Sequence, residues 1–164
     1  MIYYLSLGSN QGDKAANITN AIDFLQGIGD IEAVSSLYET APVEMETGNE
    51  NFYNLVLCIQ IPSSLSPVDL LREIKEYERC MGRDIAHSHH LPRTIDIDIL
   101  LAGDRVINTP ELVIPHKEMT KRAFVLIPLH EIAPQVVHPV LKKPVKELLA
   151  QLPARYKIYK VLRK

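Results

Sequence analysis

One stretch decides the fold: RTIDIDIL, residues 93–100, in which apolar and polar side chains alternate with a period of two. This alternation is typical of a β-strand with one buried face and one solvent-facing face. The isoleucines share the buried face, and Asp96 and Asp98 share the other. Two neighbouring carboxylates repel each other unless a cation lies between them, and hard oxygen ligands suit Mg²⁺. A solvated strand face with a salt bridge to Arg93 is the alternative interpretation at this point.

The composition is that of an ordinary globular protein. The 164 residues suit a single domain spanning residues 1–164, with 46% hydrophobic and 23% charged side chains. A formal net charge of −2 gives no general attraction for nucleic acid or anionic membranes. No apolar run approaches the roughly 20 residues that a bilayer crossing needs, and the first residues read as a strand, not a secretion signal. We therefore expect a cytoplasmic protein with Cys58 and Cys80 as buried free thiols. A monomer is our expectation, although the sequence itself does not give the oligomeric state.

Strands and helices alternate along the chain. We expect strands at 2–7, 34–40, 52–61, 95–101 and 156–161, with residues 105–107 pairing back onto the aspartate strand. Residues 8–13 have the composition of a tight turn, and a helix follows that ends at Gly27 and Gly29. A second helix begins at Ser66-Pro67 and closes at Gly82, and short helices are expected at 118–124 and 145–152. Hairpins mixed with helices predict an α+β fold, an antiparallel sheet with helices packed on it.

Several short motifs occur together along most of the chain. They are LGSN at 7–10, YETAP at 38–42, NFYN at 51–54, ERCMGR at 78–83, PRTIDIDIL at 92–100, IPHKEM at 114–119, RAFVLIPL at 122–129 and EIAP at 131–134. In this order and spacing the chain resembles the 6-hydroxymethyl-7,8-dihydropterin pyrophosphokinases of folate biosynthesis. The resemblance implies transfer of pyrophosphate from ATP to 6-hydroxymethyl-7,8-dihydropterin, with AMP as the other product. It also implies two Mg²⁺ ions and a ferredoxin-like α+β fold, which we expect as a single three-layer domain.

Asp96 and Asp98 have the spacing to hold a pair of metal ions that clamp both sides of a phosphoryl displacement. We expect both as Mg²⁺ ligands and prefer a metal-lowered hydroxyl pKa over a carboxylate acting as base. The resemblance adds Arg83 and Arg93 as catalytic residues beside them. The ATP-binding residues that it implies are Lys75, Glu78, Arg83, Arg93, Ile99, His116 and Arg122. Surface ion pairs are the alternative for the two arginines and for the Lys75–Glu78 pair, and a structural role is the alternative for His116.

The pterin site is expected on the strand that begins at Phe52. Phe52 and Asn54 share one face and Tyr53 has the other, so a ring for stacking lies beside an amide that can both donate and accept. The pterin-binding residues that the resemblance implies are Thr40, Pro42, Val43, Phe52, Asn54, Asp96 and Phe124. The alternative is that Phe52 and Phe124 belong to the core.

The sequence departs from the family pattern in the loop before Pro92. Ile85 stands where relatives usually carry a second arginine, and His90 and Leu91 replace a tryptophan and a glycine. His89 or His90 could substitute for the lost contacts to phosphate, which would make ATP affinity pH-dependent, as imidazole titrates near neutrality. Glu111 stands where relatives can carry a basic residue. Two other function classes remain at this stage, a ligand-binding regulatory module and a single-stranded nucleic-acid binder, although the second would want a basic groove.

Overall fold

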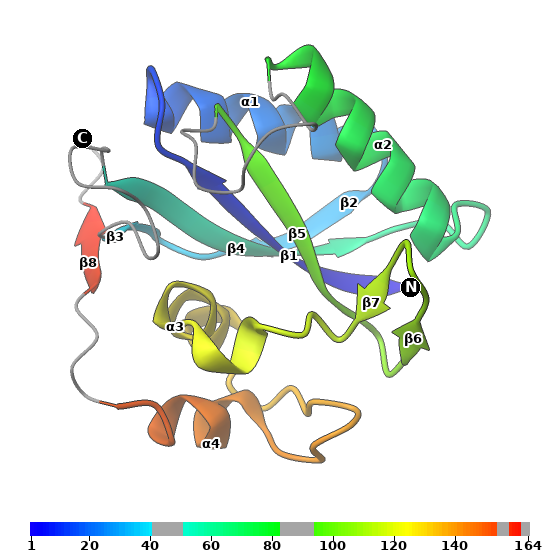
Figure 1. The fold of residues 1–164 in the computed structure, drawn as a ribbon, viewed down its shortest axis with the longest axis vertical. Helices are drawn as coiled ribbons and strands as arrows, with labels where there is room; N and C mark the ends of the chain where they lie inside the picture. Colours follow the sequence, from blue (N-terminus) through cyan, green and yellow to red (C-terminus); the bar gives the residue numbers. More distant parts are fainter. Residues whose placement is uncertain (41–50, 83–93, 154–157, 162–164) are drawn as a thin grey trace.

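A computed structural model describes residues 1–40, 51–82, 94–153 and 158–161. A central antiparallel sheet separates two layers of helices (Figure 1). Helices α1 (Lys14–Gln26) and α2 (Pro67–Cys80) cover one face, and α3 (Ala123–Ile132) and α4 (Val145–Ala150) lie on the other. Among the described residues, no helix has the length and apolar character that crossing a membrane requires.

The sheet places the strand with the two aspartates at its edge. Its order is β5-β1-β4-β3-β8, and β2 also pairs with β4. The bounds are β1 Ile2–Ser9, β2 Asp30–Val34, β3 Leu37–Thr40, β4 Phe52–Gln60, β5 Asp96–Ala102 and β8 Ile158–Val161. Every pairing among these strands is antiparallel. The predicted fold class, α+β with helices on an antiparallel sheet, is confirmed.

Alternation along the strands sends apolar side chains into two separate cores. The first core lies between the sheet and α1 and α2 and contains Ile95, Ile97 and Ile99. The second core lies between the sheet and the α3–α4 layer and contains Val56, Leu100 and Val125, among others. Asp96 and Asp98 alternate with the isoleucines and so belong to the face that carries the second core.

A β-bulge interrupts β5 beyond the two aspartates. The register with β1 shifts where Tyr4 and Leu5 face the strand, so that Leu5 pairs with Ile99 and Tyr4 with Leu101. Leu100 is the extra residue, and both Leu100 and Leu101 join the second core. Beyond the bulge, the backbone N–H of His116 donates to the carbonyl of Leu100 at 3.0 Å, which attaches the next segment to the outer edge of β5.

The helix starts follow the local chemistry of the sequence. The Ser66 hydroxyl accepts from the backbone N–H of Asp69 at 3.1 Å, with Pro67 as the first helical residue of α2. Asp13 caps α1 in the same way, accepting from the N–H of Ala16 at 3.1 Å. Gly82, which follows α2, has a φ of +94°, a conformation that favours glycine.

Several predicted boundaries are wrong. Residues 34–40 do not form one strand, because the chain breaks between β2 and β3 at Ser35, whose hydroxyl accepts from the N–H of Val56. Residues 105–107 do not pair back on β5; instead β6 (Ile107–Asn108) pairs with β7 (Val113–Ile114). The expected helix at 118–124 is a 3₁₀ turn, η1 (Met119–Lys121), followed by the longer α3. Cys58 is buried as expected, but Cys80 is exposed.

Candidate active site

The two aspartates and the predicted pterin residues occupy one face of the sheet. Gly8 pairs with Asp96 of β5 on one side and with Asn54 of β4 on the other, and Asn54 pairs in turn with Tyr38. Directly paired residues point to the same face, and neighbouring strands lie about 4.8 Å apart. Asp96 and Asn54 are therefore about 10 Å apart across Gly8. β1 thus lies between the aspartate strand and the Phe52–Asn54 strand, and Asp96 and Asn54 share one face of the sheet.

Gly8 keeps the centre of this row open. A Cβ at position 8 would lie 3.0 Å from Oδ1 of Asn54 and 3.7 Å from Cδ1 of Phe52. The sequence interpretation placed Gly8 in a tight turn, whereas the structure continues β1 through Gly8 to Ser9. Glycine occurs both in tight turns and in strands where another group approaches the backbone closely. The sequence alone therefore does not show which of these two roles Gly8 has.

Asn54 is held in a defined orientation. Its side-chain Nδ2 donates to the hydroxyl of Thr40 at 2.9 Å, and both residues are buried. Phe52 is partly buried and belongs to neither core cluster, which favours a ligand-facing ring over the core alternative. Tyr53 points to the opposite face as expected, where Lys14 lies 4.6 Å from the centre of its ring.

The segment after β7 brings three more predicted residues to this face. Phe124, near the start of α3, is partly buried and packs against the second core. The Arg122 guanidinium lies 5.6 Å from the centre of the Phe124 ring. His116, which follows the cis peptide bond between Ile114 and Pro115, places Nε2 4.0 Å from Oδ2 of Asp98.

The surroundings of His116 favour a neutral ring that donates a hydrogen bond from Nε2. Its Nδ1 accepts from the backbone N–H of Glu118 at 3.1 Å, so the proton of the neutral ring is on Nε2. Burial, with the positive charge of Arg122 as a second cause, lowers the pKa of His116. The neutral ring therefore directs its N–H toward the space beside Asp98, where a phosphate oxygen could accept it.

Negative charge accumulates around Asp98. Burial and then the charges of Asp96 and Glu78 raise the pKa of Asp98 to about 7. Arg122 and Lys75 act in the opposite direction but do not cancel these effects. The carboxylate lies deep among these groups, although 32% of its side-chain surface remains exposed. Such an environment favours a bound cation or a proton on the carboxylate.

The donor set fits Mg²⁺. This ion usually binds through one or two carboxylates and completes its shell with water and substrate phosphates, which two aspartates on one face provide. Within the described ranges, no group of three or more His, Cys, Asp and Glu side chains could hold a metal ion by itself. The site therefore suits a metal that arrives with a phosphate ligand better than a metal held by protein side chains alone.

Glu78 is buried, so the alternative of a surface ion pair between Lys75 and Glu78 is wrong for Glu78. The Glu78 side chain has no exposed surface, and its Oε2 accepts from the backbone N–H of Ile97 at 2.8 Å. Lys75, one helical turn earlier, places Nζ 3.5 Å from Oε1 of Glu78. Glu78 thus joins α2 to the residue that lies between the two aspartates.

Ile99 cannot contact a nucleotide through its side chain, because that side chain is buried in the first core. The backbone groups of Ile99, in contrast, remain available for a contact. β5 is an edge strand, and the N–H of Ile97 points outward to Glu78. The backbone groups of Ile99, two residues later, face the same outer edge. The predicted ATP contact of Ile99 is therefore limited to its backbone.

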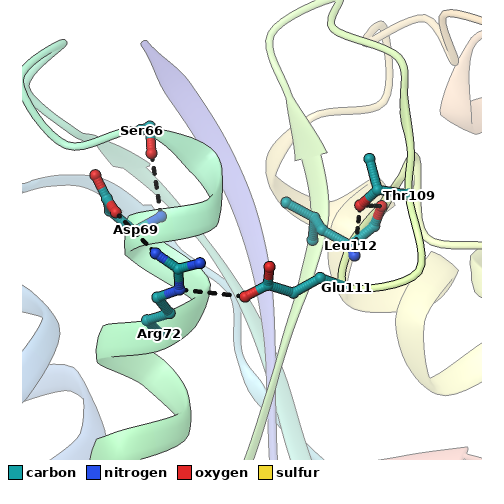
Figure 2. A network of polar contacts seen from close by, with 6 residues as sticks. All are labelled: Ser66, Asp69, Arg72, Thr109, Glu111 and Leu112. Atoms are coloured by element: carbon teal, nitrogen blue, oxygen red, sulfur yellow. Dashed lines mark hydrogen bonds and ion pairs between the residues drawn. The ribbon is translucent and has the colours of Figure 1, made fainter.

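A second connection joins α2 to the β6–β7 turn. Arg72 donates from Nε to Oε1 of Glu111 at 3.2 Å and lies 3.8 Å from Asp69 (Figure 2). Thr109 and Leu112 exchange hydrogen bonds that close the turn around Glu111. The acidic residue at position 111, where relatives can carry a basic one, is thus matched by a cation on α2.

Four predicted site residues lie outside the described ranges. They are Pro42, Val43, Arg83 and Arg93. The same holds for His87, His89 and His90. A shallow hollow lined by Met1, residues 26–30 and residues 60–63 lies at the opposite end of β1 and contains none of the predicted site residues.

Comparison with known proteins identifies the family. Residues 4–134 match the family described as 7,8-dihydro-6-hydroxymethylpterin-pyrophosphokinase, HPPK. A relative from Aquifex aeolicus (strain VF5), named 2-amino-4-hydroxy-6-hydroxymethyldihydropteridine pyrophosphokinase, is 44% identical over 144 residues, which cover 88% of each chain. The chain belongs to the HPPK family. The Bacillus subtilis (strain 168) HPPK of the same name is 39% identical over 82% of this chain and 80% of its own.

Other relatives are much longer proteins. The folic acid synthesis protein FOL1 of Dictyostelium discoideum is 40% identical over 93% of this chain, which spans 22% of that protein. A solved structure of Plasmodium falciparum HPPK-DHPS matches with a TM-score of 0.73 and 19% identity, covering 92% of this chain and 44% of that one. The structural match supports the fold, and the sequence matches confirm the predicted family and enzyme class.

Proposed function

We propose that this HPPK joins its two substrates on the α3-facing side of the sheet, with ATP phosphates over Asp96 and Asp98 and the pterin over Asn54 and Phe52. The activity of the family is ATP-dependent pyrophosphate transfer in folate synthesis. The observation that carries the proposed arrangement is the single row Asp96–Gly8–Asn54. It places metal-type ligands beside an oriented amide at a separation that suits a phosphate tail next to a flat heterocycle.

In the proposed reaction, the hydroxyl oxygen of 6-hydroxymethyl-7,8-dihydropterin forms a bond to the β-phosphorus of ATP. The bond from that phosphorus to the α,β-bridging oxygen breaks, so AMP leaves with that oxygen and the pterin carries the diphosphate. The hydroxyl loses its proton to solvent water during the attack, because a carboxylate that binds a metal is a poor base. Two Mg²⁺ ions held at Asp96 and Asp98 would supply charge neutralisation on both sides of the displacement and acidify the hydroxyl.

The remaining residues orient the substrates in this proposal. His116 donates from Nε2 to a phosphate oxygen, and Arg122 supplies positive charge to the same region. Asn54 hydrogen-bonds the polar edge of the pterin, in an orientation set by Thr40. Phe52 and Phe124 contact the faces of the ring. Lys75 and Glu78 on α2, the backbone of Ile99, and the predicted Arg83, Arg93, Pro42 and Val43 complete the two sites.

We also expect the protein to be a cytoplasmic monomer. Its expected partners are the two small-molecule substrates, ATP and 6-hydroxymethyl-7,8-dihydropterin, and neither nucleic acid nor a membrane.

The proposal is tested by exchanging each aspartate for its neutral isostere. AMP release from ATP by the wild-type protein should require both Mg²⁺ and the pterin alcohol. Asp96→Asn and Asp98→Asn should each lower turnover by roughly 10²–10³-fold, since charge stabilisation at phosphate is lost. Asp104→Asn, in the loop after β5, is the matched control. Turnover of either site variant within a few-fold of wild type would contradict the metal assignment.

A further inference from the structure

The carboxylate of Glu131 links the last turn of α3 to the segment that begins β3. Its Oε2 accepts from the backbone N–H of Ser36 at 3.0 Å and from the Ser36 hydroxyl at 2.9 Å. Its Oε1 accepts from the phenol of Tyr38. One carboxylate thus receives three donors from one short segment, and hydrogen bonds to an ionised acceptor are stronger than neutral ones.

The strand end of this link reaches the pterin side of the site. Tyr38 is 6% exposed and pairs directly with Asn54 in the β3–β4 ladder. Thr40, two residues further on the same face, accepts the hydrogen bond from Asn54. A shift of β3 relative to the α3 layer would therefore move the side chains that orient the Asn54 amide.

The helix end of the link lies on the same helix as Phe124, which the proposed function places against the pterin ring. Glu131 and Phe124 are seven residues apart in α3, which is two helical turns, so they lie on the same side of the helix. The distance along the helix axis is about 10 Å. α3 is a continuous helix from Phe124 to Glu131, although Pro128 leaves the Phe124 carbonyl without its helical donor. The contact at Glu131 therefore helps to set where Phe124 lies relative to the strands.

We propose that Glu131 is a positioning residue that sets the spacing between Phe124 and the Thr40–Asn54 pair, and thereby the fit of the pterin ring. The inference rests on the proposed function, because it takes that face as the pterin site. Glu131 lies outside the proposed pterin site and acts on it through its hydrogen bonds with Tyr38 and Ser36. If the Glu131 contact were only structural, its loss would lower the stability of the protein and would not change the affinity for one substrate more than for the other.

The test compares the affinities of both substrates in variants of the link. Glu131→Ala should raise the dissociation constant for the pterin alcohol about tenfold and leave that for ATP within about twofold of wild type. Tyr38→Phe, which removes one oxygen atom, should shift pterin affinity in the same direction by a smaller factor. Glu131→Gln, which keeps an acceptor, should restore part of the loss. In the double variant Glu131→Ala/Tyr38→Phe, the two losses should not add, since both break the same contact.

The matched control is His138→Ala. The Nδ1 atom of His138 accepts from the N–H groups of Val140 and Leu141, so this change also removes hydrogen bonds, but these lie within the segment between α3 and α4 and do not involve β3. It should lower the unfolding midpoint and leave both affinities unchanged. Equal changes in pterin and ATP affinity in the Glu131 variants, or wild-type pterin affinity in Tyr38→Phe, would overturn the inference.

Failure of the proposed function and failure of the Glu131 proposal give different experimental results. If the wild-type protein neither binds the pterin alcohol nor releases AMP, the proposed arrangement of the site has failed, and the inference about Glu131 fails with it. If the wild-type protein does both and the Glu131 and Tyr38 variants behave like it, only the inference about Glu131 is overturned.

Discussion

Single residues decide whether the two halves of the site can meet. Gly8 is the clearest case, because it lies between Asp96 and Asn54 and contributes no side chain to the gap. The pattern of isoleucines and aspartates predicted the orientation of both carboxylates correctly. The role of Gly8 was missed, because one residue cannot report which strands lie on either side of it. That information depends on the long-range pairing of β1 with both β4 and β5.

We predict that Gly8→Ala weakens pterin binding more than ATP binding. The new methyl group would lie 3.0 Å from Oδ1 of Asn54, closer than ordinary contact, so the amide must shift by a few tenths of an ångström. Pterin affinity should fall severalfold, while ATP affinity changes by less than twofold. Titration of each substrate separately measures this. Ala16→Gly in α1 is a control for altered backbone freedom, and equal losses for both substrates would contradict the prediction.

The elements show where sequence periodicity is informative and where it is not. The strand at β5 and the capped helix α2 were predicted close to their observed bounds, because each has one buried face and clear end signals. Helix α3 was missed. It carries Pro128 in its interior and packs on both the sheet and α4, so its apolar residues are not confined to one stripe and the one-sided apolar pattern is absent.

Burial also explains why the surface-pair alternative for Glu78 is wrong. A glutamate one turn after Lys75 reads as a surface pair, since charged side chains are seldom fully buried. The edge position of β5 changes this, because the outward N–H of Ile97 needs an acceptor from α2. A sequence does not show which strand lies at the edge of a sheet, so this partner was not predictable.

We predict that Glu78→Ala destabilises the protein by about 1–3 kcal/mol, the usual cost of leaving a buried donor without its acceptor. Glu78→Gln should retain much of this stability, because the amide oxygen can still accept from Ile97. Urea unfolding monitored by circular dichroism gives both values. A wild-type unfolding midpoint for Glu78→Ala would show that the contact with Ile97 does not matter for stability.

At the scale of the whole molecule, two cores pack on the two faces of one sheet, and the proposed site lies on the face that carries the second core. The first core, under α1 and α2, is closed and apolar. The second core occupies only part of its face, and polar residues occupy the part near Gly8. The fold class and the family could be predicted from the motifs, whereas the site residues that the motifs indicate stay predictions. The arrangement of these residues on one face of the sheet could be described only from the observed pairing of the strands.

We predict that the charge on Asp98 makes the metal-free protein less stable as pH rises. The pKa of Asp98 is about 7 in the folded protein against an ordinary value of 3.8. Between these values the unfolded chain has released this proton while the folded chain retains it, so the unfolded state binds fewer protons and stability falls with rising pH.

The measurement is the free energy of unfolding in EDTA between pH 4 and 8, for the wild-type protein and Asp98→Asn. The stability of the wild-type protein relative to the variant should decline as pH rises toward 7 and level off above it. Parallel curves for the two proteins would show that the folded state does not shift this titration.

The bulge at Leu100 has a consequence for how this chain tolerates changes in length. Shifting a strand by one residue exchanges its two faces, so losing one residue between Asp96 and Asp98 would turn a carboxylate into the apolar interior. Losing one residue at Leu100 would keep the pairing of both halves of β5 with β1, since that position is already surplus to the ladder, but it would remove a buried side chain and the carbonyl that accepts from His116. A change of length at this position therefore leaves the acidic half of β5 in register, and deletion scanning across 94–102 should find the least damaging point there.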